Sequence, residues 1–150
     1  MVILLDSGPL GLVTNPRPSQ DAVECNRWLE SLLVGGRDVI VPEIVDYEIR
    51  RELLRAEKTL GLERLNQFVA FLEYLPITTA AMRRAAQFWA KARKSGKPTA
   101  DDASLDVDMI LCAQAAGLTE DGFDAIIATA NVRHLSLFAK ASAWRQIGVA

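Results

Sequence analysis

The stretch DVIVPEIVDYEIRREL, residues 38–53, joins a strand pattern directly to a helix pattern. Its first five residues form a short β-branched run that is closed by Pro42, which is typical of a buried strand. After Pro42, apolar residues recur at helical spacing, which predicts a helix over residues 43–61. A strand that passes directly into a helix is the repeating unit of α/β domains, so this stretch indicates the fold class.

The same alternation of strand and helix patterns continues on both sides of this stretch. Further strands are predicted at residues 2–5, 75–78, 124–131 and 144–149. Further helices are predicted at residues 22–36, 62–75 and 79–96 and from an N-cap at Ser104 onward, with a turn at residues 6–10, DSGPL. The strands are continuous apolar runs, as strands buried on both faces require. We therefore predict a single domain over residues 1–150 with an α/β fold, in which three α/β/α layers contain a central, mainly parallel sheet of four to five short strands.

The composition fits one globular domain and excludes several classes of protein. The chain has 150 residues, of which 50% are hydrophobic, and this is enough for a core that needs no disulfides. No apolar segment approaches the length of a membrane span, and no basic region precedes the first apolar residues, so we expect a cytoplasmic protein. Cys25 and Cys112 lack the paired spacing of zinc sites, and the single histidine, His134, excludes a His-rich zinc centre.

Polar residues at the carboxyl ends of the predicted strands are candidates for a binding site, because parallel α/β sheets bind ligands there. Asp6 directly follows the strand at residues 2–5 and therefore lies at that edge of the sheet. An aspartate before Ser-Gly-Pro is also typical of a turn or a helix N-cap, so the sequence leaves both interpretations open.

Glu48 is the second candidate and lies in about the second turn of its predicted helix. On a helical wheel it shares a side with Ile44 and Val45, which would turn its carboxylate toward the strand ends. A solvated glutamate paired with Arg51 or Arg55 has the same spacing, so this second interpretation also remains open.

Asp106 and Asp108 open a predicted helix, and residues two apart on a helix do not face each other. Asp106 lies in the first turn, where the helix dipole favours an acid whatever its function. Asp108 shares its face with Leu105 and Cys112, which are suited to packing on the sheet, and a carboxylate there is costly unless it is compensated. Asp108 therefore requires a lysine, an arginine or a metal ion shared with Asp6. Carboxylates without histidines suit Mg²⁺ or Mn²⁺.

The last long predicted strand ends in Thr129 and Asn131, with His134 one turn further on. A hydroxyl, an amide oxygen and an imidazole nitrogen are thereby offered at the same edge of the sheet. Asn131 has the alternative role of capping the next segment, and for His134 we favour a surface or partly buried position.

These segments together resemble the PIN-domain family, and within it the VapC-like ribonucleases of toxin–antitoxin pairs. The similarity spans essentially the whole chain. It is carried by LLDSGPL (4–10), VPEIVDYEIRREL (41–53), DMILCAQA (108–115) and IIATANVRHLSLF (126–138). Matched residue by residue, Asp6, Glu48 and Asp108 correspond to the first three acids of the family, and Thr129 corresponds to the hydroxyl beside the fourth position.

The resemblance implies a metal-dependent endoribonuclease that hydrolyses RNA phosphodiester bonds with Mg²⁺ or Mn²⁺. Asp6, Glu48 and Asp108 would then be the catalytic residues and metal ligands. The chain departs from the family at the fourth position, which is often acidic and is here Asn131, a candidate ligand directly or through water. The missing charge would favour one metal ion over two, with Asp106 and Thr129 in supporting roles.

The resemblance also implies the partners of the protein. These are an RNA substrate, a small antitoxin and a second copy of the chain in a homodimer. The antitoxin would cover the acidic site, often with an arginine, and the apolar residues of segment 62–75 would line its groove or belong to the core. Arg93, Lys94 and Lys97 are the predicted RNA contacts, although a basic run of this kind more often forms a solvated helix face.

Two other functions remain open at this point. The asparagine at the fourth position suits a catalytically inactive PIN-like module that binds RNA or a partner without cutting. An α/β phosphatase with Asp6 as its nucleophile is disfavoured, because that chemistry usually requires a second aspartate where this chain has Gly8.

Overall fold

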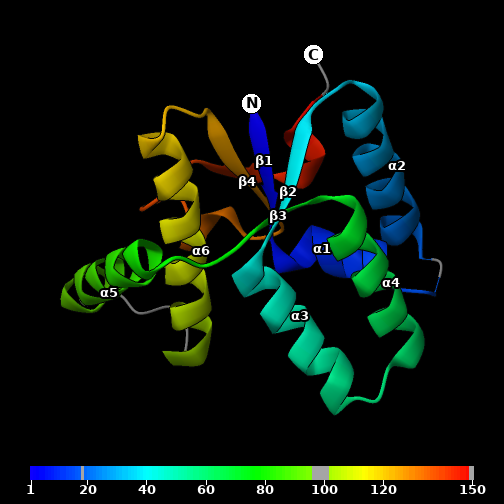
Figure 1. Cartoon of the computed structure of the whole chain (residues 1–150), viewed down its shortest axis with the longest axis horizontal. Helices are drawn as coiled ribbons and strands as arrows, with labels where there is room; N and C mark the ends of the chain where they lie inside the picture. The colour runs from blue at the N-terminus through cyan, green and yellow to red at the C-terminus, as the bar shows by residue number, and fades with distance from the viewer. Residues whose placement is uncertain (18, 96–101, 149–150) are drawn as a thin grey trace.

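The computed structural model describes residues 1–17, 19–95 and 102–148, in which strands alternate with helices (Figure 1). The strands are β1 (Val2–Leu5), β2 (Asp38–Pro42), β3 (Glu73–Leu75), β4 (Ala125–Thr129) and β5 (Ala141–Ala143). The helices are α1 (Ser7–Thr14), α2 (Gln20–Val34), α3 (Glu43–Arg55), α4 (Thr59–Phe71), α5 (Thr79–Lys94) and α6 (Asp102–Glu120), with short 3₁₀ helices η1 (Val132–His134) and η2 (Trp144–Gln146). None of the helices in these ranges combines the length and apolar character needed to cross a bilayer.

Within the described ranges, the strands form one five-stranded sheet in the order β3-β2-β1-β4-β5, and every pairing is parallel. From β1 the chain adds β2 and β3 on one side and then β4 and β5 on the other. The strand order therefore reverses between β1 and β4, which is where parallel α/β sheets bind ligands. Leu5 pairs with Ala128, so these two strands end side by side.

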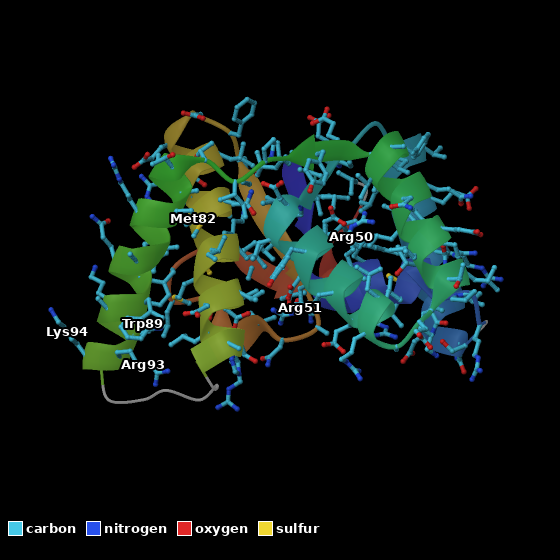
Figure 2. The ribbon with its side chains drawn as sticks, turned by 60° about the horizontal axis from the view of Figure 1, so that its bottom comes forward. Arg50, Arg51, Met82, Trp89, Arg93 and Lys94 are labelled. Carbon is cyan, nitrogen blue, oxygen red and sulfur yellow. The ribbon has the colours of Figure 1, made fainter. Side chains whose placement is uncertain are left out.

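Helices cover both faces of the sheet. All residues of β1 and β4 are buried, and successive side chains of a strand point to opposite faces. Fully buried side chains such as Leu4 and Ile127 each stabilise the fold by about 1.5–3 kcal/mol. α6 packs against β4 and α2 against β2, and α6 also lies between α3 and α5 (Figure 2). The predicted α/β fold with a central parallel sheet is confirmed.

The residues DSGPL begin helix α1 and do not form the predicted turn. Asp6 is the N-cap of this helix, and its side chain accepts a hydrogen bond from the Ser7 backbone N–H at 2.7 Å. Pro9 is tolerated because it lies in the first turn, where a backbone N–H has no partner within the helix. Glycine and proline are therefore as compatible with this helix start as with a turn.

The helix predicted over residues 43–61 is interrupted. α3 ends at Arg55, and the chain turns at Glu57, whose φ of 55° is left-handed, before α4 begins. The turn contains neither glycine nor proline, so no local signal marks it. The strand predicted at residues 75–78 lies two residues earlier, as β3.

Two further boundaries differ from the prediction. The strand predicted at residues 144–149 is replaced by β5, which ends before Trp144. Trp144 begins η2, and the centroid of its ring lies 5.4 Å from that of Trp28. β5 consists of small residues and shows no apolar run. α6 begins at Asp102, so Ser104 lies inside the helix and is not its N-cap.

Gly8 allows α1 to pack closely against Ala130, which follows β4. A Cβ atom at Gly8 would lie 2.9 Å from the Ala130 Cβ, whereas a Cβ at Gly11 would meet nothing within 4 Å. We expect Gly8→Ala to lower the free energy of unfolding by about 1–3 kcal/mol and Gly11→Ala to raise it by about 0.5–1 kcal/mol. Urea denaturation followed by circular dichroism measures both values. Equal stability of the two variants would contradict the close approach of α1 to β4.

Candidate active site

Asp6 lies at the junction of β1 and α1, and both of its carboxylate oxygens accept hydrogen bonds. Oδ1 accepts from the Ser7 backbone N–H at 2.7 Å, and Oδ2 accepts from the Thr129 hydroxyl at 2.6 Å. Thr129 is fully buried at the end of β4, and its hydroxyl oxygen also accepts from the Asn131 backbone N–H at 2.9 Å. Asp6 is therefore a helix N-cap that lies at the strand ends, and its role as a metal ligand stays a prediction.

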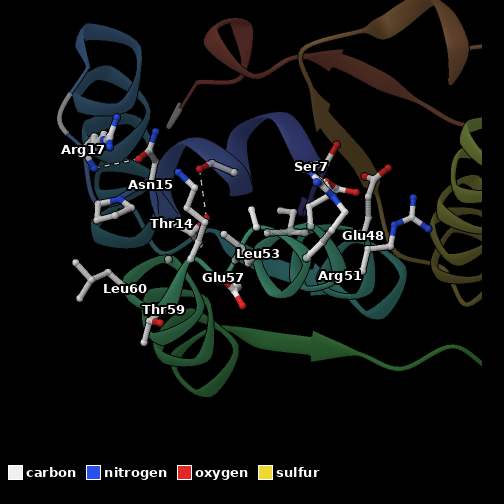
Figure 3. Close-up of a pocket in the computed structure, with 18 residues that line it drawn as sticks. Ser7, Thr14, Asn15, Arg17, Glu48, Arg51, Leu53, Glu57, Thr59 and Leu60 are labelled. Carbon is white, nitrogen blue, oxygen red and sulfur yellow. Dashed lines mark hydrogen bonds and ion pairs between the residues drawn. The ribbon is translucent and has the colours of Figure 1, made fainter.

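Glu48, on the second turn of α3, lies within electrostatic range of Asp6. Burial raises the pKa of Glu48, a hydrogen bond with the Ser7 side chain lowers it, and the negative charge of Asp6 raises it again. The charge of Arg51 lowers the same pKa, and Figure 3 shows Glu48 beside Ser7 and Arg51. The alternative partner, Arg55, pairs with a different glutamate at 2.9 Å. Glu48 thus faces the strand ends, as one of its two interpretations predicts.

Asp108, on the second turn of α6, has a mostly buried side chain that is 22% exposed. Burial, followed by the charges of Asp6 and Glu48, raises the pKa of Asp108 from 3.8 to about 7. The Nδ1 atom of His134 lies 3.6 Å from its Oδ2 atom. No lysine or arginine of the described residues forms an ion pair with Asp108. Its negative charge therefore lacks the usual compensation.

Asp6, Glu48 and Asp108 form what we term the acid cluster. Carboxylates this near to one another repel when ionised, and a divalent cation would relieve the repulsion. Oxygen donors of this kind are the ligands that Mg²⁺ and Mn²⁺ prefer. In the described part of the chain, no three His, Cys, Asp or Glu side chains are arranged to hold a metal ion. The acid cluster therefore fits a metal by the chemistry and charge of its donors, and not by a closed coordination geometry.

The other predicted site residues lie at the edge of the acid cluster or away from it. Asp106 is exposed and does not share the buried face of α6, as predicted. Asn131 is also exposed, at the N-cap position of η1 but without a side-chain capping bond, and its role as a metal ligand stays a prediction. Arg93 and Lys94 lie at the end of α5, and Lys97 falls outside the described residues.

Two further residues join the site: His134, which the sequence offered as a nitrogen donor but which we favoured as a surface or partly buried residue, and Ser7, which the sequence did not indicate. His134 is partly buried, as favoured, but it lies directly beside Asp108. Ser7 supplies its backbone N–H to Asp6 and its side chain to Glu48. The available signals were the position of Ser7 next to Asp6 and that of His134 one turn after a strand end.

A cavity of about 930 Å³ opens beside the acid cluster (Figure 3). It begins at Ser7 and Glu48, follows α1 and α3, and reaches the turn between α3 and α4. The basic side chains that line it are Arg17, Arg51, Arg55 and Lys58. A volume of this size is typical of a ligand site. Of the acid cluster, Glu48 lines this cavity, and Asp6 and Asp108 are not among its lining residues.

The fold and the acid cluster together define a class of protein, an α/β domain with a carboxylate site where the strand order of a parallel sheet reverses. The family model of the PIN domain matches residues 3–140. The chain therefore belongs to the PIN domain family, which confirms the resemblance inferred from its motifs.

Solved structures share this fold. A chain in the crystal structure of VapBC2 from Rickettsia felis, bound to a DNA fragment from their promoter, has a TM-score of 0.71 and 16% identity, covering 96% of this chain and 99% of that chain. A chain in the crystal structure of FitAcB from Neisseria gonorrhoeae has a TM-score of 0.70 and 23% identity, and the match covers 97% of this chain and 99% of that chain. A chain in the crystal structure of DNA-bound VapBC from Salmonella typhimurium has a TM-score of 0.65 and 20% identity, and the match covers 96% of this chain and 98% of that chain. A search of the curated proteins found no match.

The raised pKa of Asp108 makes the stability of the metal-free protein depend on pH. Its pKa is about 7 in the folded chain and near 3.8 in the unfolded chain, so the stability it contributes is complete below about pH 4 and is lost as the pH rises through 7. Asp108→Asn removes this loss. In EDTA, the stability advantage of the variant over the wild type should grow by about 2–4 kcal/mol between pH 4 and pH 8.

Urea denaturation at the two pH values measures this difference. Asp124→Asn is the matched control, because Asp124 is exposed at the opposite end of β4 and pairs with Lys140 at the surface. A difference between Asp108→Asn and the wild type that did not change with pH would show that Asp108 is not held in a buried, negatively charged environment.

Proposed function

We propose that this protein is a metal-dependent endoribonuclease that hydrolyses RNA phosphodiester bonds. The acid cluster carries the proposal, because Asp108 is mostly buried beside two other carboxyl groups and has no lysine or arginine ion pair among the described residues. Such an arrangement costs stability, and a bound cation would compensate it. Membership of the PIN domain family supports nuclease chemistry at this position.

Asp6, Glu48 and Asp108 would hold Mg²⁺ or Mn²⁺, with Asn131 at the exposed edge of the site. A divalent ion bound there lowers the pKa of a water molecule and stabilises the charge that develops on the phosphate oxygens. One ion is sufficient for both effects and suits a cluster with three acids.

The side chains around the acid cluster position its carboxylates. The Thr129 hydroxyl and the Ser7 backbone N–H hold the two oxygens of Asp6, which fixes that carboxylate in one orientation. Asp108, whose Oδ2 atom lies 3.6 Å from His134 Nδ1, would accept the proton of the attacking water. The protein thereby contributes orientation and proton transfer.

Under this proposal the chain is the toxin of a toxin–antitoxin pair and acts in the cytoplasm as a homodimer. The similar structures from Rickettsia felis and Salmonella typhimurium are of VapBC bound to DNA. A small antitoxin that placed an arginine in the acid cluster would neutralise its charge and exclude the metal ion. Inhibition would then use the same uncompensated carboxylates as catalysis.

A catalytically inactive PIN-like module that binds RNA or a partner is the second candidate. Two observations favour it: Asn131 stands where an acid is common in the family, and the described residues show no closed metal coordination. The two candidates differ in RNA cleavage and in metal binding, and each difference can be measured.

Asp6→Asn and Asp108→Asn preserve side-chain shape and remove one negative charge from the acid cluster. Each should lower the rate of Mn²⁺-dependent cleavage of a fluorogenic single-stranded RNA at least about 100-fold, because a charged ligand is lost. Asp124→Asn, at the opposite end of β4, should cleave at the wild-type rate. If folded Asp108→Asn cut RNA as fast as Asp124→Asn, the assignment of the site would be wrong.

Metal binding can be tested without any substrate. Saturating Mn²⁺ should raise the melting temperature of the wild type and of Asp124→Asn by about 5–10 °C, since the ion binds only the folded state. Asp108→Asn should show little or no shift, and EDTA should reverse the effect. A wild type that is insensitive to Mn²⁺ in differential scanning fluorimetry would favour the inactive module.

A further inference from the structure

Two exposed aromatic side chains each lie against an arginine one helical turn further along the same helix. On α3 the Arg51 guanidinium lies 5.2 Å from the centroid of the Tyr47 ring, and on α5 the Arg93 guanidinium lies 5.4 Å from that of Trp89. Tyr47 is 55% exposed and Trp89 is 38% exposed. Each of these aromatic–arginine pairs therefore joins an exposed aromatic ring to a guanidinium plane.

The two aromatic–arginine pairs flank the acid cluster. α6 packs against both α3 and α5, and Figure 2 shows it between them. Arg51 acts on the charge of Glu48 and lines the cavity beside the acid cluster. Figure 2 places Trp89 and Arg93 at the end of α5 that lies beside the first turns of α6, the helix that carries Asp108.

The surface around the second pair is basic. α5 contains no acidic residue, and its last turn contains Lys91, Arg93 and Lys94. The acid cluster by itself repels a polyanion, so a polyanion needs cations on the flanks in order to approach the site. Arg51 on one side and the last turn of α5 on the other provide them.

We infer that the two aromatic–arginine pairs are stacking sites for the bases of a single-stranded RNA that crosses the acid cluster between them. Aromatic rings and guanidinium planes stack on unpaired bases, whereas the bases of a duplex are stacked on one another. The inference rests on the proposed function, because it assigns the substrate class of that site. At the two pairs themselves, as distinct from the acid cluster between them, the cationic side chains favour a polyanion over an arginine of a protein segment.

Tryptophan fluorescence reports this contact, because Trp89 is the most exposed of the three tryptophans. Trp28 and Trp144 pack against each other, and Trp144 is 4% exposed. The probe is a single-stranded oligouridylate added in EDTA, where no metal ion supports cleavage. Stacking of uracil on Trp89 should quench the wild-type fluorescence. Trp89→Phe should lose the quench and still bind the oligouridylate within a few-fold of the wild type.

Fluorescence anisotropy of a labelled oligouridylate measures the affinity. Trp89→Ala and Tyr47→Ala should each weaken binding about 5- to 100-fold, the usual loss for one stacked base. Phe71→Ala is the matched control, because Phe71 is a 74% exposed aromatic residue at the end of α4, outside both pairs. It should bind like the wild type, and the binding of duplex RNA of the same length should be far less sensitive to Trp89→Ala and Tyr47→Ala.

Four results would overturn the inference. The first is wild-type affinity of Trp89→Ala and Tyr47→Ala for oligouridylate, and the second is absence of oligouridylate binding by the wild type. The third is an equal loss of affinity for single-stranded and duplex RNA in the two variants. The fourth is a loss, in these two variants, of binding to an arginine-rich peptide but not to oligouridylate, which would assign the surface to a protein partner.

Binding in EDTA is separate from cleavage, so this inference and the proposed function can fail independently. If the wild type cleaved RNA with Mn²⁺ and both alanine variants bound oligouridylate as tightly as the wild type, the stacking sites would be disproved and the proposed nuclease function would stand. If both alanine variants bound oligouridylate more weakly but the wild type did not cleave RNA with Mn²⁺, the stacking sites would stand and the proposed nuclease function would be disproved.

Discussion

The parallel pairing of β1 with β4 is the constraint on which the rest of the structure depends. It brings the two ends of the chain together, and the Thr129 hydroxyl then donates to Asp6 at 2.6 Å. Because parallel strands need a crossover, α6 runs back along the sheet before β4, and its first turns therefore lie at the carboxyl ends of the strands with Asp108. α3 starts directly where β2 ends and adds Glu48 at the same edge. The acid cluster is a consequence of the topology.

Charge compensation distinguishes the acid cluster from a second buried acid on α3. Asp46 is 9% exposed, and it accepts hydrogen bonds from Arg50 and from the Tyr74 hydroxyl, the latter at 2.8 Å. Its charge is satisfied within the protein, and it links α3 to β3. Asp108 is also mostly buried, but among the described residues the only basic side chain that forms a contact with its carboxylate is His134. An uncompensated buried acid is destabilising, and such groups concentrate at functional sites.

Local patterns account for the predictable part of the fold and the site. Within residues 38–53 a continuous apolar run gives way to apolar residues at helical spacing, which indicates a strand followed by a helix. The position of Asp6 directly after an apolar run places it at the strand ends. The turn at Glu57 was missed because it uses a left-handed residue that is not glycine, and the strand Ala141–Ala143 was missed because it has no bulky apolar residue. The position of His134 one turn after a strand end places it at the correct edge of the sheet, but its contact with Asp108 depends on how α6 packs, which the sequence spacing does not express.

Close packing also explains how the acid cluster stays in place despite its repulsion. Gly8 lets α1 reach Ala130, and the Asp6 backbone N–H donates to the Ala128 carbonyl at 3.0 Å while its carboxylate caps the helix. Helix start, strand pairing and steric contact therefore form one unit that cannot move without breaking the bond to Thr129. Backbone hydrogen bonds and the buried core oppose the electrostatic repulsion in place of paired charges. The carboxylates are thus held in position while their charge remains unsatisfied, and in that state a bound cation or a cationic partner gains the most from each of them.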